Sequence, residues 1–82
     1  MTEIIWTEKF EKEVKKIKNS VIKERVKNII RKIIERPNVG KPLRYALKGE
    51  RTLYAKPFRF IYSIQRNRIY LLRFEHRKRV YK

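Results

Sequence analysis

The hydrophobic residues of this 82-residue chain follow two different periods, one in each half of the sequence. In the first half they recur every three or four positions, which is the spacing of one face of an α-helix. From about residue 52 onward they alternate with polar residues, as in a β-strand that buries one face. The pattern therefore predicts helices followed by a sheet, which is an α+β fold.

Two helices are predicted before the sheet. Residues 3–6 form a short apolar run, interpreted as an edge strand, and Thr7 is suited to cap the helix that follows. A break at Asn19 and Ser20 starts a second helix with Ser20 as its cap, and Pro37 ends it, because a residue before proline is pushed out of the α region. The short connection predicts an antiparallel helical hairpin. The apolar positions are Phe10, Val14 and Ile17 in the first helix and Ile22, Val26, Ile29, Ile30 and Ile33 in the second.

Three strands are predicted at residues 52–56, 58–65 and 69–75, with a bend at Pro57 and a turn at Arg66–Asn67. The expected architecture is an N-terminal helical hairpin packed on one face of a small antiparallel sheet. Alternation places an apolar set under the helices, and the opposite parity projects arginines from the open face. The expected apolar set is Phe58, Phe60, Tyr62, Ile64, Tyr70, Leu72 and Phe74, with His76 at the same parity, and the expected arginines are Arg59, Arg73 and Arg77.

Length and composition exclude several classes of protein. A chain of this size forms one domain, predicted to span residues 1–82. It has no cysteine and one histidine, which excludes a disulfide framework, a cysteine-based metal site and a histidine-rich zinc site. It has no long apolar run and no secretory signal pattern, so we expect a cytoplasmic protein without a membrane partner.

Charge points to a polyanionic partner. The chain carries 24 Lys and Arg against 8 Asp and Glu, a formal net charge of +16. Residues 52–82 hold nine of the cations, one acid and seven of the ten aromatic residues. Cations interleaved with aromatic rings suit RNA, whose phosphates attract the charge and whose bases stack on the rings.

The residue types also limit the chemistry. The chain has no glycine-rich phosphate loop, no carboxylate cluster for divalent metals and no histidine pair, which argues against a kinase, a metal-dependent nuclease or a protease. A basic surface can still cleave RNA, because the substrate's own 2′-OH is the nucleophile. The protein then positions that hydroxyl, neutralises the phosphorane and assists proton transfer. Arginine suits the second task, since its fork pairs with phosphate and keeps its charge.

Three motifs resemble those of the RelE/ParE toxin superfamily, and of RelE-like mRNA interferases in particular. They are Pro42-Leu43 with Leu47-Lys48-Gly49, then Tyr54 with Phe58-Arg59-Phe60-Ile61-Tyr62, then His76-Arg77-Lys78-Arg79-Val80-Tyr81. The resemblance implies the toxin of a type II toxin–antitoxin pair, a ribosome-dependent endoribonuclease that cuts mRNA in the A site without metal or cofactor. The implied partners are a RelB-like antitoxin, the ribosome and mRNA.

The resemblance also implies roles for four residues: three would be catalytic, and a C-terminal tyrosine would stack on a base. Two further cations, Arg73 and Lys48, are expected to attract the substrate by general electrostatics. The catalytic set is Arg59, Arg77 and Lys56, and the substrate-binding set is Tyr81, Arg73 and Lys48.

Two departures from the family pattern leave alternatives open. Pro57 stands where the family has glycine. Glu75 also stands where many members have glycine, and it can pair with Arg73 or Arg77 and weaken the site. ParE-type members share the fold, act on DNA gyrase and lack the nuclease residues. The alternatives are therefore a gyrase-directed toxin, a basic RNA-binding module, or a degenerate member that only associates with a partner. The presence of Arg59, Arg77 and Tyr81 favours the nuclease.

Overall fold

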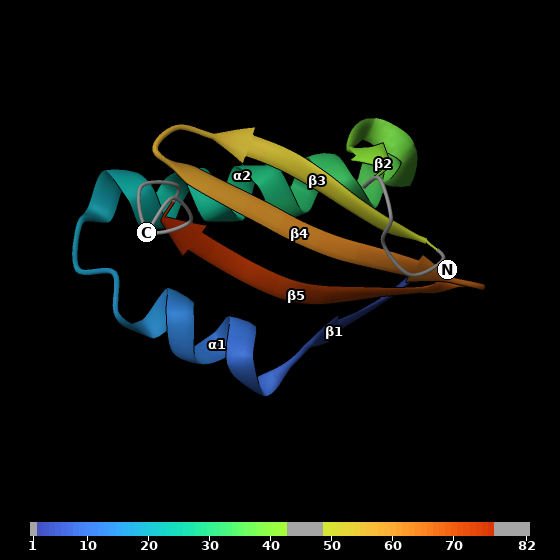
Figure 1. The fold of residues 1–82 in the computed structure, drawn as a ribbon, viewed down its shortest axis with the longest axis horizontal. Helices are drawn as coiled ribbons and strands as arrows, with labels where there is room; N and C mark the ends of the chain where they lie inside the picture. The colour runs from blue at the N-terminus through green and yellow to red at the C-terminus, as the bar shows by residue number, and fades with distance from the viewer. Residues whose placement is uncertain (1, 43–48, 77–82) are drawn as a thin grey trace.

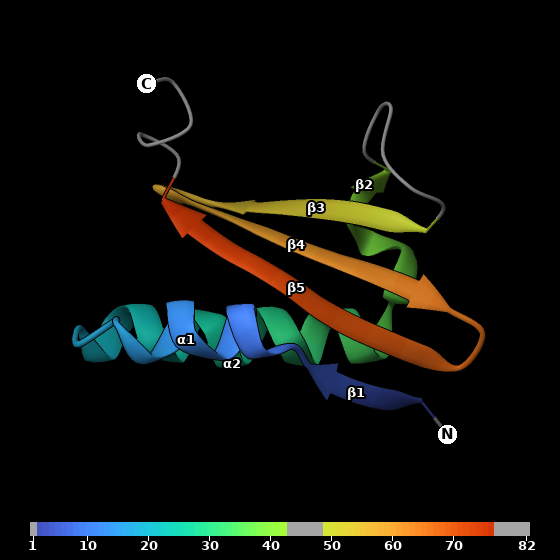
Figure 2. The same ribbon diagram turned by 60° about the horizontal axis from the view of Figure 1, so that its bottom comes forward.

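The computed structural model describes residues 2–42 and 49–76. Two helices lie on one face of a five-stranded sheet (Figures 1 and 2), as the α+β prediction requires. A short 3₁₀ turn, Pro37–Val39, follows the second helix. In chain order the elements are β1 (Glu3–Trp6), α1 (Glu8–Lys15), α2 (Ser20–Glu35), β2 (Lys41–Pro42), β3 (Glu50–Ala55), β4 (Phe58–Gln65) and β5 (Arg68–His76).

The sheet is mixed, which corrects the predicted antiparallel sheet. Its strand order is β1-β5-β4-β3-β2, and β1 pairs with β5 in parallel while the other pairs are antiparallel. The fold therefore opens with a strand, and the helical hairpin is not at its N-terminus. The edge strand interpreted at residues 3–6 is confirmed. Its partner is the last described strand, a pairing across more than sixty residues that local patterns do not reveal.

The start of α1 is fixed by Thr7, as predicted. Its hydroxyl oxygen accepts a hydrogen bond from the Phe10 N–H at 3.4 Å. The same hydroxyl donates to the Leu71 carbonyl of β5 at 2.6 Å. One side chain thus caps the helix and attaches its first turn to the sheet.

The cap of α2 is Asn19, which corrects the prediction of Ser20. The Asn19 Oδ1 accepts hydrogen bonds from the Val21 N–H at 2.8 Å and the Ile22 N–H at 3.2 Å. Ser20 is the first residue inside the helix. Both residue types favour caps, so the sequence alone could not choose between neighbours.

A β-bulge changes which side chains of β5 face the helices. Ile61 pairs with Arg73 and Tyr62 pairs with Leu71, so Leu72 is the additional residue. On the C-terminal side of the bulge, the predicted alternation correctly places Phe74 in the core. On the N-terminal side, the buried and exposed positions are exchanged, so the prediction that Tyr70 and Leu72 face the helices was wrong. The residues buried in that stretch are Ile69 and Leu71.

The core lies between the helices and the sheet. Tyr62 is fully buried, and its hydroxyl donates to the Pro37 carbonyl at 2.7 Å and accepts from the Gly40 N–H at 2.9 Å. A Cβ at Gly40 would come within 2.8 Å of that hydroxyl, so only glycine lets the loop lie this close to Tyr62. No helix in the described ranges is long and apolar enough to cross a membrane. The buried cluster is Phe10, Val26, Ile33, Phe60, Tyr62, Ile69, Leu71 and Phe74.

Candidate functional site

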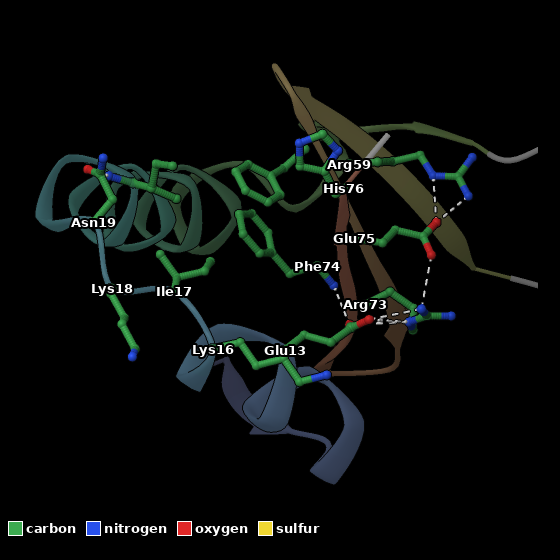
Figure 3. A pocket seen from close by; sticks show the side chains of 12 residues that line it. Glu13, Lys16, Ile17, Lys18, Asn19, Arg59, Arg73, Phe74, Glu75 and His76 are labelled. Carbon is green, nitrogen blue, oxygen red and sulfur yellow. Dashed lines mark hydrogen bonds and ion pairs between the residues drawn. The ribbon is translucent and has the colours of Figure 1, made fainter. Parts of the chain in front are cut away.

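A cleft of about 640 Å³ lies where β4 begins and β5 ends, beside the connection between α1 and α2 (Figure 3). Its floor is apolar and comes from both layers of the fold. Its rim carries Lys16, Lys18 and the Glu13 carboxylate on the helix side, and two arginines and the Glu75 carboxylate on the sheet side. The apolar side chains are Ile17, Ile22, Phe58 and Phe74.

Stacked aromatic rings form the sheet side of this floor. The Phe58 and Phe74 rings stack with centroids 4.5 Å apart and an interplanar angle of 18°. The His76 ring meets Phe58 edge-on at 5.2 Å, so the histidine is packed against an aromatic ring at the mouth of the cleft. Phe58 and His76 are paired in the β4–β5 register, which places these rings together. The floor is a preformed apolar surface.

Four charged side chains form a chain of ion pairs along the sheet side of the cleft (Figure 3). Glu75 stands between two arginines: its Oε1 accepts from Arg59 Nε at 3.0 Å and also from Nη2, and its Oε2 lies 3.0 Å from Arg73 Nη2. Glu13 of α1 accepts from Arg73 Nε and Nη2, the latter at 2.9 Å, and from the Phe74 N–H at 2.8 Å. The network therefore joins α1 to β5 and β5 to β4.

The network is partly buried, and this burial strengthens the attraction between its charges. The Glu75 side chain is 16% exposed and that of Arg59 is 26% exposed, so water screens the pair less than a surface pair. The hydrogen bonds with Glu13 raise the pKa of Arg73 above its ordinary value, although burial opposes this. The forks of both arginines thus already hold carboxylates, and they are not open to a phosphate in this arrangement.

The structure brings together two of the six predicted site residues. Arg59 and Arg73 lie on either side of Glu75. Lys56 lies in the turn between β3 and β4, outside the lining of the cleft, and its backbone carbonyl accepts a hydrogen bond from Arg25 Nη1 at 2.8 Å. The three remaining residues, Lys48, Arg77 and Tyr81, lie outside the described residues.

The sequence analysis missed Glu13. This glutamate follows Phe10 by three positions and precedes Ile17 by four, so helical spacing places it on the buried face of α1. An acid on an otherwise apolar face predicts a cationic partner, because an unpaired buried charge is costly. That signal was present in the sequence, although the partner, Arg73, could not be identified from it.

Comparisons with known proteins cover nearly the whole chain. Residues 4–81 match the family model described as "ParE toxin of type II toxin-antitoxin system, parDE". The fold matches a solved structure described as "Chromosomal ParDE TA system from P. aeruginosa", with a TM-score of 0.63 and 21% sequence identity over 93% of this chain and 96% of that chain. No curated protein matches the sequence.

These findings correct the functional prediction. The prediction of a ribosome-dependent endoribonuclease, and of an enzyme, is contradicted, because the family that matches is ParE, whose members typically act on DNA gyrase. The RelE/ParE resemblance holds at the level of the superfamily, and its finer assignment to RelE-like interferases has no support. The ribosome and mRNA lose their support as partners. A toxin–antitoxin system implies an antitoxin partner.

Proposed function

Because this chain belongs to the family of ParE toxins of type II toxin–antitoxin systems, we propose that it inhibits DNA gyrase and is neutralised by an antitoxin. The observation that carries the proposal is the family match over residues 4–81. Such a toxin acts by binding a protein, so it needs a recognition surface and no catalytic constellation. This function was the stated alternative to the nuclease, and the presence of Arg59, Arg77 and Tyr81 was not sufficient to exclude it.

The cleft supports a protein-binding function. Protein interfaces are anchored by apolar contacts and oriented by charges around them. Here stacked phenylalanines and two isoleucines form an apolar floor, and Lys16 and Lys18 stand exposed beside it. Neither lysine takes part in an ion pair with another described residue, whereas the arginines opposite are neutralised by carboxylates. The cleft therefore suits an apolar side chain flanked by acidic ones, and we place the contact with gyrase there.

The antitoxin is proposed to be an acidic, amphipathic segment. The net charge of +16 attracts such a segment at long range and repels a second copy of this chain. Helical and extended segments both bind by placing apolar residues in a groove.

A supercoiling assay with purified gyrase, ATP and relaxed plasmid tests the proposal. The wild-type protein should block supercoiling or trap gyrase on cleaved DNA. In a parallel translation reaction, primer extension should show intact mRNA. The double variant Lys16→Glu, Lys18→Glu should lose inhibition, because it reverses the charge of the cleft rim. The control Lys23→Glu, Lys27→Glu makes the same charge change on exposed positions of α2 away from the cleft and should retain it.

Two outcomes would contradict the proposal. Unchanged gyrase activity at a molar excess of folded toxin would remove gyrase as the target. Equal loss of inhibition in both double variants would leave the target in place and exclude the cleft as the contact surface.

A further inference from the structure

The tip of the β4–β5 hairpin, residues 65–68, forms a second polar site at the opposite end of these strands from the cleft (Figure 2). All four of its side chains are exposed, none is acidic, and each can donate hydrogen bonds. A hollow of about 440 Å³ lies beside them, and Glu3 and Tyr70 complete its lining. The four residues are Gln65, Arg66, Asn67 and Arg68.

Arg66 adopts a backbone conformation that disfavours its side chain. Its φ is 58°, in the left-handed region that residues with a Cβ rarely adopt. At Gly49, where φ is 84°, the chain uses glycine, and a Cβ there would lie 2.5 Å from the Ile64 carbonyl oxygen. Glycine at position 66 would remove the strain in the same way. The Arg66 side chain is exposed and has no ion pair or side-chain hydrogen bond with any described residue. We therefore look for its partner outside the molecule.

The base of the tip is hydrogen-bonded to the N-terminal strand. The Glu3 N–H donates to the Asn67 carbonyl at 2.9 Å, and the Glu3 carboxylate accepts from Arg68 Nε at 3.1 Å. A hydrogen bond with Tyr70, together with Glu3, raises the pKa of Arg68. Arg68 thus belongs to the contacts between the hairpin and β1. The side chains of Gln65, Arg66 and Asn67 have no ion pair or side-chain hydrogen bond with any described residue, and they stay available at the end of the hairpin.

We propose that this tip binds duplex DNA by entering the major groove. A two-stranded ribbon fits the major groove of B-form DNA, which is about 12 Å wide. Arginine pairs with guanine edges there, and asparagine and glutamine pair with adenine edges. The net charge of +16 supplies the long-range attraction to the phosphates. A-form RNA is a poor fit, because its major groove is too narrow for side chains to read. The inference is independent of gyrase inhibition, which does not require the toxin itself to touch DNA.

Fluorescence anisotropy with a fluorescein-labelled 20-base-pair DNA duplex at 0.15 M salt tests the inference. Arg66→Gly should weaken binding about tenfold, and the uncharged change Asn67→Ala about fivefold, as expected for lost base contacts. The control Arg31→Ala removes the same charge from an exposed position of α2 and should weaken binding only about twofold. Arg66→Gly should also raise the thermal unfolding midpoint, which separates lost binding from lost folding.

Several results would overturn the inference. The tip would be excluded as the DNA-binding site if Arg66→Gly and Arg31→Ala weakened DNA binding equally. The same would follow if Asn67→Ala bound DNA as tightly as the wild type does. Groove entry would be excluded if an RNA duplex of the same sequence bound as tightly. If the wild-type protein did not bind DNA, the proposal of a DNA-binding site would be wrong. Gyrase inhibition would be unaffected by that result, because the supercoiling assay tests it separately.

Discussion

At the scale of single residues, the Glu75 carboxylate determines what the adjacent arginines can bind. It contacts both Arg59 and Arg73, and Glu13 takes the remaining side of Arg73. Carboxylates and phosphates compete for the same guanidinium fork, and a carboxylate on the neighbouring strand competes at high effective concentration. Counting cations therefore overstates how well this face holds RNA.

Replacing Glu75 with glutamine should expose this competition. Glu75→Gln removes the charge between the two arginines, so affinity for a single-stranded RNA oligonucleotide should rise. The log–log dependence on salt should steepen by about 0.7 for each arginine that gains a phosphate. Binding titrations at several salt concentrations measure both effects. Glu24→Gln, which removes an exposed charge on α2, is the matched control; an equal gain there would show only a change in overall charge.

The buried hydroxyl of Tyr62 gives a second residue-scale prediction. Tyr62→Phe leaves the Pro37 carbonyl and the Gly40 N–H without their partner and should lower the free energy of unfolding by about 1–3 kcal/mol. Burial raises the pKa of Tyr62 above its ordinary value. The stability supplied by the neutral hydroxyl is thus present below about pH 10 and lost as pH rises through the raised pKa.

Denaturant unfolding of both proteins between pH 7 and 11 measures the effect. The advantage of the wild type over Tyr62→Phe should be constant at neutral pH and shrink above about pH 10. A constant difference across the whole range would contradict the raised pKa.

At the scale of elements, two side chains, one near each end of α1, hold this helix in register with β5. Thr7 caps α1 and bonds to β5, and Glu13 binds Arg73 and the Phe74 N–H of the same strand. The bulge at Leu72 lies between these two attachments and sets which face of β5 each half presents. Without the bulge, one strand could not bury Ile69, Leu71 and Phe74 on the same side.

The cap of α2 provides the element-scale prediction. Asn19→Ala removes the acceptor of two backbone N–H groups and should lower the free energy of unfolding by about 1 kcal/mol. Ser20→Ala, at the neighbouring position that sequence patterns favour equally, should change it by much less. Thermal unfolding of the two variants decides between the caps, and the reverse order of stability would contradict the structure.

At the scale of the whole molecule, the first and last described strands are neighbours. β1 pairs with β5 in parallel, and α1 packs against the same strand, so the N-terminal part and the sheet share one core. The Trp6 ring meets Phe10 edge-on at 5.1 Å, and Phe10 meets Phe60 of β4 at the same centroid distance. We propose on this basis that residues 1–82 form a single domain.

A single domain should unfold in one cooperative transition. Fluorescence of Trp6 reports on the junction of β1 and α1, while far-ultraviolet circular dichroism reports on all helices and strands. The two thermal or denaturant curves should coincide with the same midpoint. Separate midpoints would show that the N-terminal part melts independently of the sheet.

By itself the sequence determined the local features of this protein. Hydrophobic periods predicted the two helices and the strand at residues 58–65, and capping chemistry predicted Thr7 as the start of α1. These features depend on residues within a few positions of one another, so a linear pattern contains them. Motifs identified the superfamily for the same reason, because each motif is a local string of residues.

Tertiary structure decided what depends on distant partners. The parallel pairing of β1 with β5, the bulge at Leu72, and the ion pairs of Arg59 with Glu75 and of Arg73 with Glu13 all join different elements. The pair of Arg73 with Glu75, two positions apart on β5, is local, and its prediction from the sequence is confirmed. The functional prediction was limited in the same way. Arginines are visible in any sequence, but whether their forks are open to phosphate or closed by carboxylates depends on which side chains the fold brings beside them.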